Sequence, residues 1–228
     1  PPQPRPPSPP VRPSSDPPVP LPPTPVRVAG TSRLIYELRL AVFASVPLIP
    51  RSIEVVDVED GSVIADVRGD DLARRLRVPG QPIDHARPPA IAPGMLGVLY
   101  LELSLSEDQM PGELEHRVTF HALGDDANPP PVVTGARVPV DGEPPVILGP
   151  PLRGGPWTAV YDPSWERGHR RVVYAVDGRA RIPGRFAVDW ILLDEHGHLA
   201  RGDDDVIDNW YGYGADVLAV ADGVVVAA

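Results

Sequence analysis

The chain has 228 residues, a net charge of -10, 33 prolines, 21 glycines and no cysteine. The lack of cysteine excludes disulfides, zinc–thiolate sites and a cysteine nucleophile, and the acidic balance argues against nucleic acid as a partner because phosphate binding needs a basic footprint. No apolar run approaches the roughly 20 residues of a membrane-spanning helix, so no membrane span is expected.

The first 27 residues are about half proline, mixed with serine, arginine and aspartate. Such a segment favours extended polyproline II and has too few apolar groups to form a core. We therefore expect a disordered, proline-rich linker over residues 1–27. The sequence opens on Pro1 and shows no signal peptide, which says nothing about secretion.

Residues 28–148 have the pattern of short antiparallel strands. Apolar and other residues alternate over 34–42, 99–105 and 114–120, which is typical of half-buried strands. Asp60-Gly61 lies between two further apolar runs and indicates a hairpin, and the only helix-like stretch is around Asp70–Leu76. Because short strands with turns between them are typical of sandwiches, we expect an immunoglobulin-like β-sandwich domain here.

Residues 149–228 are predicted to form a second all-β domain. Gly149–Gly155 looks like a linker, Asp177-Gly178 and Asp222-Gly223 indicate hairpin turns, and Phe186–Leu192 alternates like a strand. The sequence ends within the last strand pattern, and a sheet cut there would have an unpaired apolar edge. We therefore expect this antiparallel domain to be truncated.

Two stretches of the second region resemble motifs of the LytM/lysostaphin-type zinc metallopeptidases. Arg185–Trp190 (RFAVDW) is similar to the metal-binding strand of that family, and Tyr213–Val226 is similar to its glycine-led hairpin. The resemblance covers about residues 150–228. It implies a small antiparallel β domain, a Zn²⁺ cofactor, hydrolysis of peptide amide bonds in peptidoglycan, and a place in the cell envelope or outside the cell.

The resemblance places Asp189 at the position of the family's aspartate ligand. Arg185 stands where the family has its first histidine ligand, and a permanently charged guanidinium cannot bind a cation. His169 is the best substitute. The family's later H-x-H motif, which supplies the last ligand and a base, does not follow residue 198, so no catalytic residue is assigned and the chain alone is not expected to be active.

All four tryptophans lie in the second region. Trp190 is expected in a core, whereas Trp210 and Tyr211 are expected to line a groove for peptide or glycan. Arg185 is a further candidate for substrate binding. The alternatives are a non-catalytic binding or regulatory protein on a degenerate LytM-type domain, and a purely structural β-sandwich module.

Three other polar groups have simpler interpretations. His196-Gly197-His198 follows Asp194 and is expected to be a solvated turn. Asp203–Asp205 lacks the ligand pattern of a calcium loop and is expected to be a solvated acidic loop. His116 is on the apolar face of its strand and is expected to be a hydrogen-bonded core or edge histidine.

Overall fold

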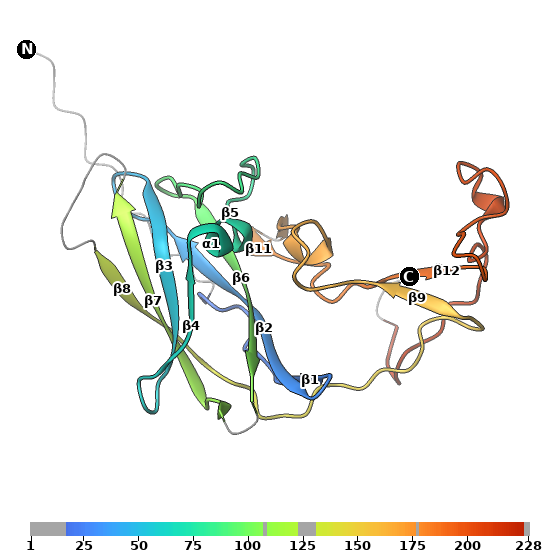
Figure 1. The fold of residues 1–228 in the computed structure, drawn as a ribbon, viewed down its shortest axis with the longest axis horizontal. Helices are drawn as coiled ribbons and strands as arrows, with labels where there is room; N and C mark the ends of the chain where they lie inside the picture. Colours follow the sequence, from blue (N-terminus) through green and yellow to red (C-terminus); the bar gives the residue numbers. More distant parts are fainter. Residues whose placement is uncertain (1–16, 107–108, 123–130, 177, 226–228) are drawn as a thin grey trace, which may run out of the picture. The chain divides into compact units, whose positions relative to one another are not determined.

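A computed structural model describes residues 17–106, 109–122, 131–176 and 178–225. Within these residues the fold is mostly β, with antiparallel sheets and one short α-helix (Figure 1). The chain divides into two compact units, Pro1–Pro144 and Pro145–Ala228.

The first sheet of the first unit has the strand order β1-β2-β6-β5. Leu34, Tyr36 and Leu38 lie opposite Leu103, Leu101 and Leu99 in the antiparallel pairing of β2 with β6. Because side chains alternate between faces along a strand, this register puts all six on one face. The strands are β1 (Val26–Val28), β2 (Thr31–Ala41), β5 (Leu76–Arg77) and β6 (Leu96–Leu105).

The second sheet of the first unit has the order β4-β3-β7-β8. Ile53 pairs with Val118 and Val55 with His116 across the β3–β7 ladder. The predicted Asp60-Gly61 turn joins β3 to β4. The elements are β3 (Leu48–Asp57), β4 (Val63–Arg68), β7 (Glu113–Ala122), β8 (Val132–Pro139) and the helix α1 (Gly69–Arg75), which follows β4.

Both sheets and α1 contribute to one hydrophobic core, so the predicted alternation of the first region is confirmed. Leu34, Leu101, Ile53, Leu114 and Leu72 are fully buried, and the core also contains the apolar residues of the facing strands. The helix expected around Asp70–Leu76 is present as α1, with Leu72 as its main core contact.

The last part of the proline-rich segment lies against the first unit. The carbonyl of Pro18 accepts a hydrogen bond from the Arg39 amide (2.7 Å), and that of Pro23 accepts one from Asp141 (2.9 Å). Val19 is 7 % exposed and belongs to the core. The first unit thus extends upstream of residue 28, where the sequence pattern placed its beginning.

The second unit is built from short elements. β9 (Trp157–Val160) pairs with β12 (Asp189–Leu192), and β10 (Tyr174–Val176) pairs with β11 (Arg179–Arg181) around the predicted turn at residue 178. Two 3₁₀ turns complete it: η2 (His169–Arg171) and η3 (Ile207–Asn209).

The segment after residue 215 differs from its prediction as a hairpin. Within residues 215–225 the structure has no strand. Residues 149–153 pair with residues 216–220 instead, through Gly149 N to Val220 O (2.8 Å), Leu218 N to Pro151 O (2.8 Å) and Arg153 N to Asp216 O (3.0 Å). The predicted linker, Gly149–Gly155, therefore forms the backbone hydrogen bonds that were expected from a hairpin partner. The end of the predicted second hairpin strand, 226–227, lies outside the described residues.

Among the described residues, no helix has both the length and the apolar character needed to cross a membrane.

Candidate functional site

The two predicted metal ligands lie side by side in the second unit. His169 is the first residue of η2, and Asp189 is the first residue of β12. His169 Nε2 is 2.9 Å from Asp189 Oδ1 and 3.1 Å from Oδ2. The side chains are 49 % and 60 % exposed. Two side chains that are 20 residues apart in the sequence thus come together at a site that solvent can reach.

The turn that carries His169 is fixed by the two arginines that follow it. Arg170 is 3 % exposed and its Nη1 donates to the Pro163 carbonyl at 3.1 Å. Arg171 donates from Nε to the Trp165 carbonyl (3.0 Å) and from Nη2 to the Ser164 carbonyl (3.2 Å). These bonds tie η2 to the loop at residues 163–165, so the imidazole extends from an anchored backbone.

A glycine fits closely against His169. A Cβ at Gly184 would lie 2.9 Å from His169 Cβ and 3.3 Å from the His169 carbonyl oxygen. Gly184 belongs to a bend in which Arg185 N donates to Ile182 O (3.2 Å) and Ala187 N to Gly184 O (3.1 Å). Sequence reasoning missed this residue because an isolated glycine in a loop carries no motif of its own.

Asp189 lies in an open environment. It shares a face of its strand with Ala187 and Ile191, yet its side chain is 60 % exposed. Asp189 begins β12, which among the described residues pairs with one strand, β9. Asp189 is paired with His169 rather than buried.

The pair fits a zinc ion in donor type. Ligand atoms at 2.0–2.2 Å from a tetrahedral zinc are about 3.3–3.6 Å apart, so the 2.9 and 3.1 Å between His169 Nε2 and the Asp189 oxygens would have to widen slightly to hold the ion. A catalytic zinc site needs three protein ligands. In the part of the chain that the structure describes, no three His, Cys, Asp or Glu side chains come together as a metal site, so the pair by itself does not complete one.

A second feature of the unit is a pocket with aromatic walls, which we call the tryptophan pocket. Its volume is about 300 Å³, and it is lined by Trp157, Trp190, Ile191, Leu192, Leu199, Ile207, Trp210, Gly212 and Tyr213. Gly212 packs closely on Trp157, since a Cβ there would lie 2.9 Å from the Trp157 ring. Trp190 is 38 % exposed, so the expectation of a core position was wrong, and it forms a wall instead.

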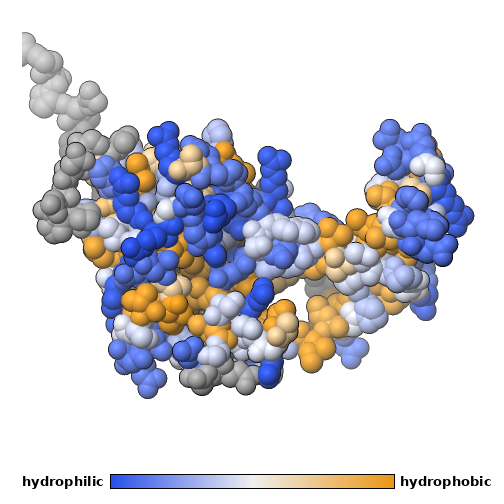
Figure 2. Space-filling model, viewed as in Figure 1, coloured by the Kyte–Doolittle hydropathy of each residue, from blue (hydrophilic) through white to orange (hydrophobic). Residues whose placement is uncertain are grey.

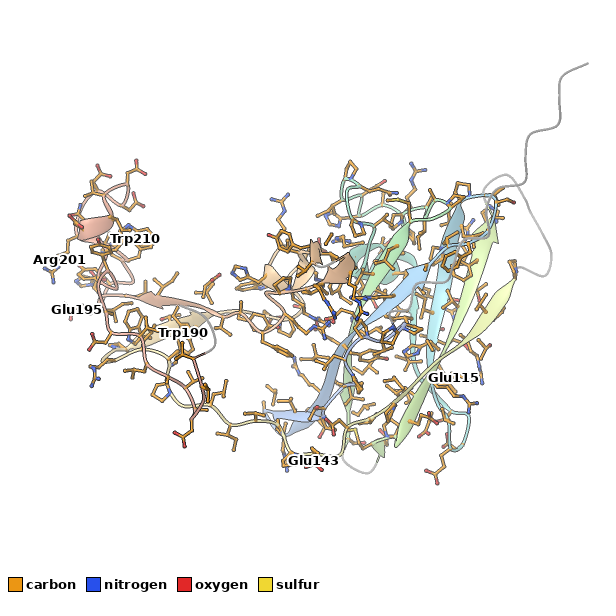
Figure 3. All side chains as sticks on the ribbon, turned by 180° about the vertical axis from the view of Figure 1, so that it is seen from behind. Glu115, Glu143, Trp190, Glu195, Arg201 and Trp210 are labelled. Carbon is orange, nitrogen blue, oxygen red and sulfur yellow. The ribbon has the colours of Figure 1, made fainter. Side chains whose placement is uncertain are left out.

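The predicted groove residues Trp210 and Tyr211 have different roles. Trp210 lines the pocket, and its Nε1 donates to the Asp204 carbonyl at 2.8 Å. Tyr211 is not among the lining residues: its hydroxyl donates to Asp194 (3.3 Å) and its ring lies 5.2 Å from the Arg201 guanidinium carbon. Figure 3 shows Trp210 and Arg201 near the same end of the second unit. Arg185 is half-buried and belongs to the bend beside His169.

The His196–His198 stretch is a turn, as predicted. Asp194 Oδ1 accepts the backbone N–H groups of His196 (2.9 Å) and His198 (2.8 Å). These bonds, led by the one from His198, lower the pKa of Asp194 to about 2, because they stabilise the ionised carboxylate. The two imidazoles are 6.0 Å apart between ring centroids. Both histidines belong to a local turn that Asp194 holds through their backbone N–H groups.

No protein-family model matches the chain, and comparisons with the curated proteins and with the solved structures also give no match. The functional interpretation therefore depends on the two structural features of the second unit, the His169–Asp189 pair and the tryptophan pocket.

Proposed function

We propose that the second unit is a LytM/lysostaphin-type domain of a zinc-dependent peptidase that cleaves peptide amide bonds of peptidoglycan, at the cell envelope or outside the cell. The observation that carries the proposal is the 2.9 Å contact between His169 Nε2 and Asp189 Oδ1. The family resemblance singled out Asp189 as a ligand, and His169 was chosen because Arg185 cannot bind a cation. Neither argument used the distance between the two side chains.

In this function, His169 and Asp189 would hold the zinc ion, and the third protein ligand would come from outside the described residues. A bound zinc lowers the pKa of its water to about 7 and polarises a carbonyl group. Arg170 and Arg171 keep the imidazole in place through their bonds to the loop at 163–165. The exposure of the pair leaves room for a substrate.

We also propose that the first unit is an immunoglobulin-like β-sandwich that acts as an accessory domain. Two four-stranded antiparallel sheets and a shared hydrophobic core support this assignment. The proline-rich segment ahead of it would act as a spacer up to the point where Pro18 and Val19 join the sandwich.

A second candidate function, a binding or regulatory protein on a degenerate LytM-type domain, is favoured by Arg185. This residue directly follows Gly184, which packs on His169. Arg185 stands where the family has its first histidine ligand, and a guanidinium cannot bind a cation. The two functions share the domain and differ in whether the pair retains a metal ion.

Zinc binding tests the proposal directly. Isothermal titration of the purified chain with zinc chloride should give one site, weakened at least about tenfold by His169→Ala and by Asp189→Asn, since each removes one of two ligands. His85→Ala, which changes an exposed histidine of the first unit, is the matched control and should bind as the wild type does. Equal affinity in the wild type and the His169→Ala/Asp189→Asn double variant would refute the metal site.

Hydrolysis separates the two candidate functions. The protein as its host produces it should release peptides from cross-linked peptidoglycan when loaded with zinc, and the Asp189→Asn variant should not. Binding of the cross-link peptide without zinc binding and without hydrolysis would favour the regulatory function.

A further inference from the structure

The tryptophan pocket has a wall chemistry that favours one kind of ligand. Three indole rings and one phenol ring surround about 300 Å³, which is the lower end of the range for small-ligand sites. Trp190, Trp210 and Tyr213 are 38 %, 39 % and 57 % exposed, so part of each ring is open to a ligand. The negatively charged faces of such rings attract cations, and indole does so best.

The segment that forms most of the pocket carries mainly negative charge. The segment 190–213, which supplies every lining residue except Trp157, has one arginine and no lysine. It has six carboxylates: Asp194, Glu195, Asp203, Asp204, Asp205 and Asp208. The loop that brings Ile207 and Trp210 to the pocket carries four of these, all on exposed residues. A cation that approaches is therefore attracted by the loop as well as by the rings.

One positive charge of the chain is already packed on this aromatic cluster. The guanidinium carbon of Arg201 lies 5.2 Å from the ring centroid of Tyr211, within the distance of a cation–π contact. Arg201 and Tyr211 are not among the residues that line the pocket. The indole faces inside the pocket are left for a ligand.

We propose that the tryptophan pocket binds the ammonium-bearing aliphatic side chain of a peptide, of the lysine type. The methylene stem packs on Ile191, Leu192 and Leu199, and the ammonium group lies against the indoles and faces the acidic loop. An anionic ligand is disfavoured by the carboxylates, and an uncharged apolar ligand gains nothing from them. The choice of a peptide as the carrier of the side chain rests on the proposed function.

Two short peptides of equal length test the inference. Acetyl-Ala-Lys-Ala-amide carries the ammonium group, and acetyl-Ala-norleucine-Ala-amide has an aliphatic side chain without it. Tryptophan fluorescence should show binding of the lysine peptide at least about fivefold tighter, as one cation–π contact predicts. This preference should shrink when sodium chloride rises from about 0.05 M to about 0.5 M, because salt screens the acidic loop.

Two variants probe the two sources of the preference. Trp210→Leu keeps an apolar wall and removes an indole face, so the lysine preference should fall by about half or more. An Asp204→Asn/Asp205→Asn/Asp208→Asn variant changes only exposed side chains and should also reduce it. Trp165→Leu, at a tryptophan outside the lining, should retain the full preference. Equal binding of both peptides to the wild type, or an unchanged preference in both test variants, would overturn the inference.

The same titration in the His169→Ala/Asp189→Asn variant separates this inference from the proposed function. If this variant retains the lysine preference, the result supports lysine binding by the tryptophan pocket, whatever the zinc titration shows. Zinc binding by the wild type without a lysine preference would leave the metal site standing and refute the pocket.

Discussion

The two units of this chain stabilise themselves in different ways. The first has strands of up to 11 residues in two facing sheets, and these enclose a core that includes Leu34, Leu101 and Ile53 at 0 % exposure. In the second, strands have three or four residues, and among the described residues of this unit Arg170 is the one that is buried. Figure 2 shows apolar residues, drawn orange, on the surface of the second unit. The exposed apolar residues of this unit include Phe186 (77 %), Val217 (80 %), Val224 (87 %) and Val225 (83 %).

The difference shows which forces position the candidate site. Two-stranded sheets are marginal by themselves in water, so the second unit depends on turns and on side chains that form hydrogen bonds with the backbone. Arg170 and Arg171 hold η2 in this way, and Asp194 holds the turn at His196–His198. Polar contacts therefore hold the candidate functional residues in position, whereas apolar burial stabilises the first unit.

Core truncation gives the largest expected effect and tests this contrast first. Leu101→Ala should lower the free energy of unfolding of the first unit by about 2–5 kcal/mol, because it leaves a cavity between the sheets. Val217→Ala, at an 80 % exposed residue of the second unit, should change the stability by less than about 0.5 kcal/mol.

The distribution of aromatic residues allows the two units to be followed separately. All four tryptophans belong to the second unit, so their fluorescence reports on that unit, while far-UV circular dichroism in urea is dominated by the longer strands of the first. A Val217→Ala effect as large as that of Leu101→Ala would contradict the contrast between a closed core and an open surface.

Predictions from the sequence were more accurate for the first unit than for the second. Alternation over residues 34–42 and 114–120 predicted buried faces because long strands in facing sheets repeat one environment every second residue. Asp60-Gly61 predicted its hairpin because turn geometry restricts the residues that fit. In these elements the pattern is local and the tertiary structure agrees with it.

The same methods were less accurate where short segments choose distant partners. The apolar run at 215–221 looks like half of a hairpin, yet residues 216–220 pair with 149–153. The tryptophan pocket draws Trp157, Trp190 and Trp210 from separate segments, and no spacing rule joins them. The His169–Asp189 pair was reached only because a family resemblance singled out Asp189 and led to the choice of a histidine.

Gly184 offers a test at the candidate site itself. Gly184→Ala would place a methyl group 2.9 Å from His169 Cβ, so the imidazole must move relative to Asp189. Changes in residues that orient metal ligands typically weaken binding by about 10- to 100-fold, and we expect a loss of zinc affinity in that range. The measurement is zinc titration, with the ring signals of His169 in NMR spectra as a second readout that needs no metal.

Gly223→Ala is the matched control in the same unit, since a Cβ there meets nothing within 4 Å. It should leave zinc affinity and the His169 signals unchanged. If Gly184→Ala also leaves both unchanged, the close packing of the bend on η2 does not position the imidazole.

The smallest expected effect concerns a buried histidine of the first unit. His116 is 1 % exposed and lies between the Tyr36 hydroxyl (Nε2 at 2.9 Å) and the Ala136 carbonyl (Nδ1 at 2.9 Å). Because a carbonyl only accepts, Nδ1 carries the proton and Nε2 accepts from Tyr36 in the neutral form. Burial lowers the pKa of His116, and this outweighs the Ala136 bond and the charge of Glu115, which raise it.

A lowered pKa in the folded state makes the stability of the first unit depend on pH. The neutral ring's contribution is complete above the unfolded pKa of about 6.5, and it is lost as the pH falls from there through the folded pKa. Urea unfolding should therefore give a lower free energy of unfolding at about pH 5 than at about pH 7.5. His116→Gln should reduce this loss of stability, because it removes the titrating imidazole and leaves every carboxylate in place.

Tyr36→Phe separates the titration from the hydrogen bond. It removes the partner of Nε2 but keeps the imidazole, so it should lower stability by about 1–3 kcal/mol at both pH values while the acid-side loss persists. A His116→Gln chain with the full wild-type loss would show that other groups cause the acid sensitivity. In that case the buried histidine only fills space and forms hydrogen bonds within the core.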